Sequence, residues 1–154
     1  MIQNNEIILP NLKQYKIVPK NHFAYATNHI EEGSIGYQID YDYSLISPMY
    51  TVFKTNENKI NNHFLYALLK TPLMIYNYKS RIEGSIDRRG GLRYNTFAKI
   101  PILLPTLNEQ NAISKILTTI DEEINIQHKK LETLRTQKCG LMQQLLTGKT
   151  RVKI

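Results

Sequence analysis

The chain has 154 residues, of which 42% are hydrophobic and 21% are charged, and its formal net charge is +7. This balance is typical of a folded protein and argues against a disordered one. The sequence shows no run of about 18 apolar residues and no secretory signal, and its single cysteine, Cys139, excludes an internal disulfide. We therefore expect a cytoplasmic protein without a membrane span.

Residues 6–57 have the composition of short strands separated by turns. β-Branched and aromatic residues in 14–26 are interrupted by a turn signal that begins at Pro19. The segment 30–54 repeats this pattern, with glycines and a Ser-Pro step dividing its apolar runs. The first third of the chain is therefore expected to be rich in β-structure.

Two short helices are predicted next. The first covers 63–70, which is apolar on most faces, and Asn61 or Asn62 can cap it. The second begins after Thr71 as the N-cap, has a proline at its first helical position, and runs to residue 80.

The segment from Arg81 to Arg93, here named the arginine segment, holds four arginines and three glycines. Residues 81–95 carry too much glycine and charge for a regular element, so we expect a loop. Guanidinium groups can grip a phosphate or the edge of guanine, and glycines let a backbone approach a ligand and adopt positive φ. The alternative is a solvated surface loop whose charges have no ligand. Residues 98–105 are expected to form a short strand or an extended lead-in.

A single long helix is predicted from about 107 to 146. Thr106 and Glu109 fit a capping box at its start, and Gly148 fits a helix stop. Such a helix would be roughly 60 Å long. Its apolar residues recur in steps of four and three, which is a heptad register. They form what we name the apolar seam: Ile113, Leu117, Ile120, Ile124, Leu131, Leu134, Leu141 and Leu145.

The other faces of this helix are polar, so the apolar seam needs a partner. A second helix is the favoured partner, and the alternative is a helix folded back over its own domain. Gln127 and Lys138 occupy the two remaining seam positions and could fix the register of pairing.

No catalytic motif is apparent. The sequence lacks GxGxxG, a P-loop, GxSxG and HExxH, and its histidines show no metal-ligand spacing. Acidic residues at 121–123 are expected on the solvated face of the long helix, and Cys139 is read as a small apolar residue. We predict a non-catalytic binding component with no cofactor and no metal site.

One further motif is a phenylalanine, an Ile-Pro step, Leu-Pro-x-Leu-x-Glu-Gln, an isoleucine and Leu-x-x-Ile-Asp. Its residues are Phe97, Ile100, Pro101, Leu104, Pro105, Leu107, Glu109, Gln110, Ile113, Leu117, Ile120 and Asp121. With this motif the sequence resembles the specificity subunit of type I restriction-modification systems. Residues 15–26, 33–37 and 46–54 resemble the middle of that family's target recognition domain, so the match covers nearly the whole chain.

The resemblance implies an α+β protein with three parts. A small mixed, partial target recognition domain (1–105) is followed by one long coiled-coil-type spacer and dimerisation helix (106–148) and a basic tail (149–154). The domain would read one half of a split double-stranded DNA sequence. The helix would pack antiparallel against a second such helix and dock methyltransferase subunits, which bind S-adenosylmethionine and methylate adenine. The restriction subunit, which translocates and cleaves DNA, is a further candidate partner.

The charge pattern supports a DNA-binding role for the middle of the chain. Residues 58–105 hold eight Lys or Arg against two Asp or Glu, a local basic footprint. Lys79, Arg81 and Lys99 are expected to contact phosphates, and base-edge contacts are expected among the remaining arginines. The candidate DNA-binding residues are Lys79, Arg81, Arg88, Arg89, Arg93 and Lys99.

The chain departs from the family pattern at its start, because it has no tryptophan and begins too late to hold the usual first segment of the recognition domain. It therefore resembles a second recognition domain with its front missing: a half-subunit that forms a homodimer, a product of gene rearrangement, or a relic. The hypothesis from another class is an interaction protein that does not bind DNA and only docks on partner subunits through its helix. An enzyme in its own right is the least favoured reading.

Overall fold

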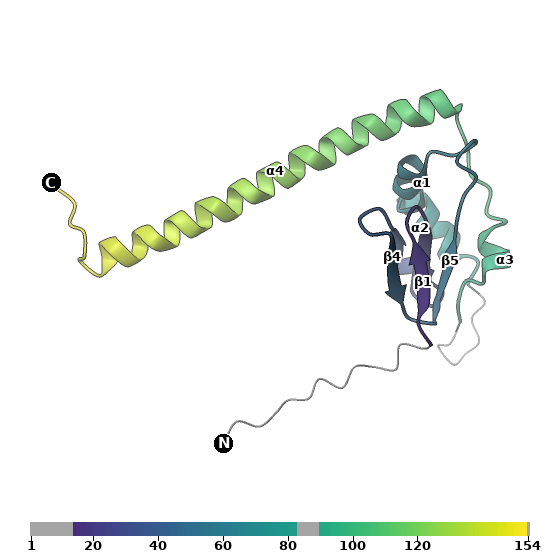
Figure 1. The fold of residues 1–154 in the computed structure, drawn as a ribbon, viewed down its shortest axis with the longest axis horizontal. Helices are drawn as coiled ribbons and strands as arrows, with labels where there is room; N and C mark the ends of the chain where they lie inside the picture. The colour runs from purple at the N-terminus through teal and green to yellow at the C-terminus, as the bar shows by residue number, and fades with distance from the viewer. Residues whose placement is uncertain (1–13, 83–89, 154) are drawn as a thin grey trace, which may run out of the picture. The chain divides into compact units, whose positions relative to one another are not determined.

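The computed structural model describes residues 14–82 and 90–153. They belong to two compact units, residues 1–111 and residues 112–154 (Figure 1). In the described part of the chain the first unit holds every strand, three short α-helices and the first turn of the long helix, and the second holds the rest of that helix. The predicted α+β class with a long C-terminal helix is confirmed, whereas the expected domain limits at 105 and 148 stay predictions.

The strands form two antiparallel sheets. β1 (Lys16–Pro19) pairs with β4 (Tyr43–Ile46), while β3 (Ile35–Tyr37), β2 (Phe23–Ala26) and β5 (Tyr50–Phe53) form a three-stranded sheet with β2 in the middle. The predicted turn after Pro19 is present, with Asn21 in the left-handed region at φ 61°. This turn does not close a hairpin, because β1 and β2 enter different sheets.

Aromatic side chains on one face of the three-stranded sheet form the centre of the core. Phe23 stands opposite Tyr37 on one neighbouring strand and opposite Phe53 on the other. Its ring centroid lies 4.7 Å from that of Tyr37 and 5.1 Å from that of Phe53. Tyr25, two residues along β2, stacks on Phe97 at 4.7 Å. Phe23 and Tyr25 are fully buried, so this face is the interior of the domain.

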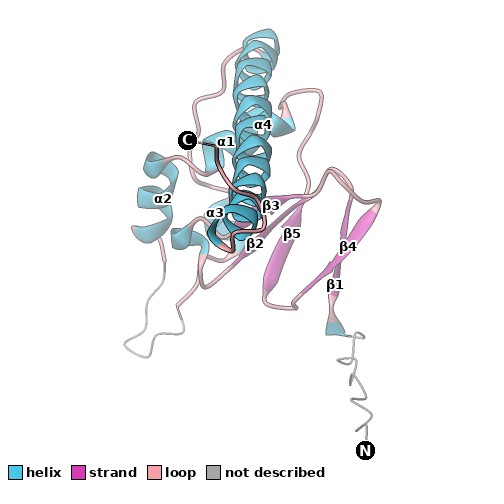
Figure 2. Cartoon of the chain, turned by 90° about the vertical axis from the view of Figure 1, so that its left-hand side faces the viewer, coloured by secondary structure: helices cyan, strands magenta, loops and turns pink. Residues whose placement is uncertain are grey.

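Two helices cover this core. Asn61, rather than Asn62, caps α1 (Asn62–Leu69) by accepting a hydrogen bond from the amide of Phe64 at 3.0 Å. Thr71 caps α2 (Pro72–Lys79), as predicted, by accepting from the amide of Met74. Figure 2 shows the three-stranded sheet with α1 and α2 on one side and the β1–β4 ribbon on the other. The helices add to the core Leu65, Leu69, Met74 and Tyr78.

The segment after the arginine segment differs in part from the expectation. A four-residue helix, α3 (Tyr94–Phe97), begins inside the stretch 81–95 that was predicted to be a loop throughout. It forms because Phe97 has a place in the core and the amide of Ala98 bonds back to the carbonyl of Tyr94 at 2.8 Å. A short 3₁₀ helix, η2 (Ile30–Glu32), is a second element that the pattern did not predict. Of the two alternatives for 98–105, the extended lead-in is the one observed.

The long helix is confirmed at its predicted bounds as α4 (Leu107–Leu146), 40 residues long. The hydroxyl of Thr106 accepts a hydrogen bond from the amide of Glu109 at its start. At its end Gly148 adopts φ 72°, and its amide donates to the carbonyl of Leu145 at 3.2 Å. Among residues 14–82 and 90–153, no helix is both long enough and apolar enough to span a membrane.

Candidate nucleic-acid interface

The described residues of the arginine segment are 81–82, directly after α2, and 90–93, which lie beside the end of β2. The amide of Leu92 donates to the carbonyl of Thr27 at 2.7 Å, and the hydroxyl of Tyr25 donates to the carbonyl of Leu92 at 3.0 Å. Leu92 is fully buried. The return of the segment is therefore fixed to the core by its backbone and by one buried side chain.

The start of the segment is fixed in the same way. Tyr78, near the end of α2, is fully buried and its hydroxyl donates to the carbonyl of Leu69 at 2.9 Å. Burial raises the pKa of both the Tyr78 and the Tyr25 phenols above their ordinary value. Both phenols are therefore neutral hydrogen-bond donors at physiological pH. Their bonds to backbone carbonyls attach both ends of the arginine segment to the core.

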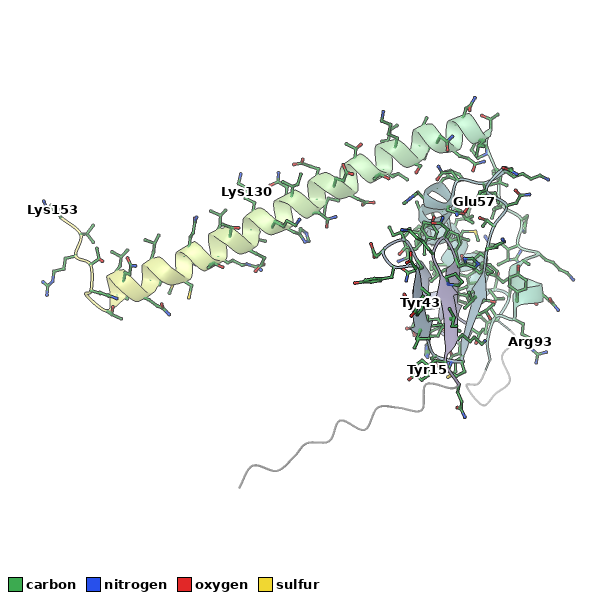
Figure 3. The ribbon with its side chains drawn as sticks, in the orientation of Figure 1. Tyr15, Tyr43, Glu57, Arg93, Lys130 and Lys153 are labelled. Atoms are coloured by element: carbon green, nitrogen blue, oxygen red, sulfur yellow. The ribbon has the colours of Figure 1, made fainter. Side chains whose placement is uncertain are left out.

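The predicted DNA-binding residues lie at these two ends. Lys79 and Arg81 stand where the segment begins, and Arg93 and Lys99 follow its return. Lys79, Arg93 and Lys99 are exposed, and Figure 3 shows Arg93 projecting from the surface of the domain. Arg88 and Arg89 lie outside the described residues.

Arg81 differs from the other cations because it already has partners. It is half-buried, and its Nη1 donates to the carbonyl and to the side-chain Oδ1 of Asn77, at 3.1 Å and 2.6 Å. These bonds hold one side of the guanidinium against the last turn of α2. A guanidinium carries five N–H donors, so others are left for a ligand.

Gly91 has a structural role that the sequence did not reveal. The sequence suggested that the glycines of the segment let the backbone approach a ligand at positive φ, but Gly91 does not have positive φ. A Cβ built on Gly91 would stand 2.9 Å from the carbonyl oxygen of Thr27. The close approach is therefore to Thr27, the residue that directly follows strand β2, and a glycine at position 91 makes this approach possible.

We expect Gly91→Ala to lower the free energy of unfolding by about 1–3 kcal/mol, because the backbone of Thr27 cannot move aside without breaking its bond to Leu92. Urea denaturation followed by tyrosine fluorescence measures the loss. Gly140→Ala is the matched control, since nothing lies within 4 Å of a Cβ built there. Gly140 lies within α4 in the second unit, which holds no tyrosine, so that change should leave the fluorescence midpoint unchanged. Equal effects of the two substitutions would contradict the role given to Gly91.

Gln110 is a second residue whose position the sequence did not predict. Only 1% of its surface is exposed, although it stands in the first turn of α4. Its Oε1 accepts from the amide of Asn61 at 2.9 Å, and its Nε2 donates to the carbonyls of Pro105 at 2.9 Å and Lys59 at 3.3 Å. One side chain thus joins the loop before α1 to the segment that leads into α4. The only signal in the sequence was its place in the Glu-Gln motif.

A small cluster of metal-type donors stands on the turn after β2. Ligand atoms of His29, Glu31 and Glu32 lie within 4.8 Å of one another, and His29 Nδ1 is 3.5 Å from a carboxylate oxygen of Glu32. Sequence spacing had not drawn attention to these residues. His29 and Glu32 are exposed, and exposed acidic groups commonly gather without a metal, so the expectation of no metal site stays a prediction.

The apolar seam of α4 is the other candidate interaction surface. Seven of its eight residues are exposed, including Leu131 at 47% and Leu134 at 52%, and Ile113 is half-buried. Leucine and isoleucine at heptad positions with this exposure are typical of a helix whose partner is another helix. The register also sets Gln127 within the seam, where its Nε2 donates to Glu123 at 2.7 Å.

Comparison with known proteins relates the chain to one family of domains. A family model described as the type I restriction modification DNA specificity domain matches residues 2–136. The chain is 36% identical over 106 residues to a Methanocaldococcus jannaschii protein named "Putative type I restriction enzyme MjaX specificity subunit". It is 34% identical over 102 residues to the MjaVIII specificity subunit of the same organism. The matched stretches cover 65% and 66% of this chain but only 23% of either relative, so the chain spans about a quarter of their length.

Proposed function

Because the chain belongs to the family of type I restriction modification DNA specificity domains, we propose that it is a sequence-recognition component of a type I restriction-modification complex. It acts as a specificity subunit or half-subunit and directs methyltransferase and restriction subunits to a bipartite DNA target in the cytoplasm. The observation that carries this proposal is the family match across residues 2–136, which includes both the arginine segment and most of α4. Chemistry on DNA belongs to the partner subunits, and this chain is not an enzyme.

The arginine segment and its two ends supply the DNA contacts in this proposal. Leu92 and Tyr78 attach the two ends of the arginine segment to the domain. The segment therefore has less conformational entropy to lose when it binds DNA. The exposed cations Lys79, Arg93 and Lys99 can approach phosphates, and a guanidinium can also form two parallel bonds to a guanine edge. Lysine and arginine at these positions make affinity for DNA depend on salt.

We expect Arg93→Ala with Lys99→Ala to weaken binding to a duplex about tenfold or more at low salt. The slope of log K against log salt should fall by about 0.9 for each phosphate that the variant no longer neutralises. Arg88→Ala with Arg89→Ala should act in the same direction. Fluorescence anisotropy with a labelled duplex over a salt series measures both quantities. Unchanged affinity and slope in both double variants would exclude the arginine segment as the DNA-binding surface.

A homodimer through the apolar seam completes the proposal. One copy supplies one recognition domain, and a two-fold pair of α4 helices supplies two. Because the symmetry of the protein is mirrored in its DNA, such a dimer would read an interrupted palindrome. The exposure of the seam residues and their heptad spacing support this pairing.

The experiment that tests the function as a whole is co-purification with the adenine methyltransferase subunit from the same cell, at moderate salt. A stable complex that methylates DNA at a defined sequence is the expected result. A chain that binds neither the methyltransferase subunit nor duplex DNA would contradict the proposal.

A further inference from the structure

A polar cleft opens at the end of the domain away from the arginine segment. Its volume is about 630 Å³. Two loops form its walls: the turn between β1 and β2, and the loop between β5 and α1. We name it the lysine cleft, and its lining residues are Lys20, Asn21, His22, Lys54, Thr55, Asn56, Glu57 and Asn58.

The chemistry of the lysine cleft suits an anion. Lys20 and Lys54 stand on opposite walls, are exposed, and form no salt bridge with any carboxylate in the described residues. Glu57 is the only acidic residue of the lining, and its Oε1 is turned toward the side-chain amide of Asn62 at 3.4 Å. The positive charge of the two ammonium groups is therefore only partly offset, and the remaining side chains offer amide and hydroxyl donors.

Hydrogen bonds hold the wall that carries Lys20. The amide of Lys20 donates to the carbonyl of Asp42, and the amide of Asn21 donates to that of Gln38, both at 2.8 Å. His22 Nδ1 donates to the carbonyl of Lys20 at 2.9 Å. This turn is therefore ordered by bonds to the segment between β3 and β4 as well as by its own.

The opposite wall is ordered in a comparable way. Asn56 Oδ1 accepts from the amide of Asn58 at 3.1 Å, and its carbonyl accepts from the amides of Lys59 and Ile60. The side chain of Gln110 also donates a hydrogen bond to the carbonyl of Lys59 at 3.3 Å. The backbone of both walls is thus fixed before any ligand arrives, while the two lysine side chains remain free to reach it.

The position of the cleft relates it to the arginine segment. Strand β2 begins beside the cleft at Phe23 and ends at Ala26, next to the bond between Thr27 and Leu92. Four strand residues span roughly 13 Å. Figure 3 accordingly shows Glu57 at the end of the domain away from Arg93. Two separate basic surfaces therefore lie at opposite ends of β2. Their spacing is close to the width of the major groove, about 12 Å, so one duplex can contact both through phosphates on the two sides of that groove.

We propose that the lysine cleft is a second DNA-contact surface, in which Lys20 and Lys54 grip the phosphate backbone at a distance from the arginine segment. This inference rests on the proposed function, since it adds a phosphate clamp to a domain that reads DNA. Contacts at two points fix the orientation of the domain on the duplex better than contacts at one.

The test is a salt series with the 154-residue chain and a labelled 30-base-pair duplex of randomised sequence. Lys20→Ala with Lys54→Ala should weaken binding about tenfold or more at low salt and lower the salt slope by about 1.8, the value for two phosphate contacts. Lys129→Ala with Lys149→Ala is the control, because it removes the same charge from exposed positions of the second unit. The control should leave the slope unchanged.

The outcomes separate this inference from the function on which it rests. If the Lys20 and Lys54 double variant binds like the control while Arg93→Ala with Lys99→Ala is weakened, the lysine cleft is not a DNA contact and the proposed function stands. If the unaltered chain binds no duplex, this inference falls, and co-purification with the methyltransferase subunit then decides the proposed function. Loss of binding that is equal in the control and in the cleft variant would show an effect of net charge alone and would also overturn the inference. Tyrosine fluorescence melts verify that the first unit of each variant is folded, and helical circular dichroism verifies α4.

Discussion

Replacing Leu131 and Leu134 with glutamate should convert the proposed homodimer to a monomer. Both side chains lie in the apolar seam, about half exposed in the single chain, and heptad pairing would bury them against a second helix. Burying a leucine contributes about 1.5–3 kcal/mol, and a dimer contains two copies of each. Glutamates at these positions would also place like charges close together in the pair. We expect dissociation to be favoured by more than about 1,000-fold.

Sedimentation velocity or light scattering between about 1 and 100 micromolar measures this change. The matched control is Ile126→Glu with Thr133→Glu, which adds the same charge to the same helix. These two residues are one heptad apart and stand outside the seam, and Ile126 is 58% exposed. The control should remain a dimer. A monomer before any substitution, or a control that dissociates as readily as the seam variant, would contradict pairing through the apolar seam.

The monomeric variant also separates recognition from assembly. Its recognition domain is unchanged, so it should still bind a duplex through the arginine segment, with a weaker affinity because one domain replaces two. Preference for an interrupted palindrome over a single half-site should disappear. Selection from a randomised duplex pool with both forms of the protein would show whether two-fold symmetry of the target depends on α4.

The local signals in the sequence were reliable where the structure depends on neighbouring residues. The caps at Asn61, Thr71 and Thr106 each involve a side chain and an amide three residues later, so their spacing is visible in the sequence. The bounds of α4 followed from a capping box, a heptad repeat and Gly148 for the same reason. Turn residues between the first strands were equally readable, as at Asn21.

The sequence could not show the contacts between distant residues. β1 pairs with β4 across a long separation, with Ile17 opposite Leu45, because burial of Val18 on the inner face fixes the register. Helix α3 is too short for a periodic pattern, and it exists because the core accepts Phe97. The two loops of the lysine cleft lie more than thirty residues apart, so neither loop alone suggested a site.

Gln110→Ala should destabilise the first unit by about 2–4 kcal/mol, a large part of the stability of a domain of this size. The substitution leaves the amide of Asn61 and the carbonyls of Lys59 and Pro105 without their buried partner. Each buried polar group left without a hydrogen bond costs about 1–3 kcal/mol. Water that enters the site would recover part of this cost. It also leaves a cavity where a side chain with 1% exposure had been.

The ten tyrosines make this prediction measurable within one unit, because all of them lie between residues 15 and 94 and the chain has no tryptophan. Tyrosine fluorescence during urea denaturation therefore reports on the first unit, while α4 contributes most of the helical circular dichroism. Gln143→Ala is the control, since Gln143 is an exposed glutamine in the same helix and should change stability by no more than about 0.5 kcal/mol. If the urea midpoint of Gln110→Ala equals that of the unaltered chain, water has replaced the three hydrogen bonds. Gln110 would then not hold the start of α4 to the domain.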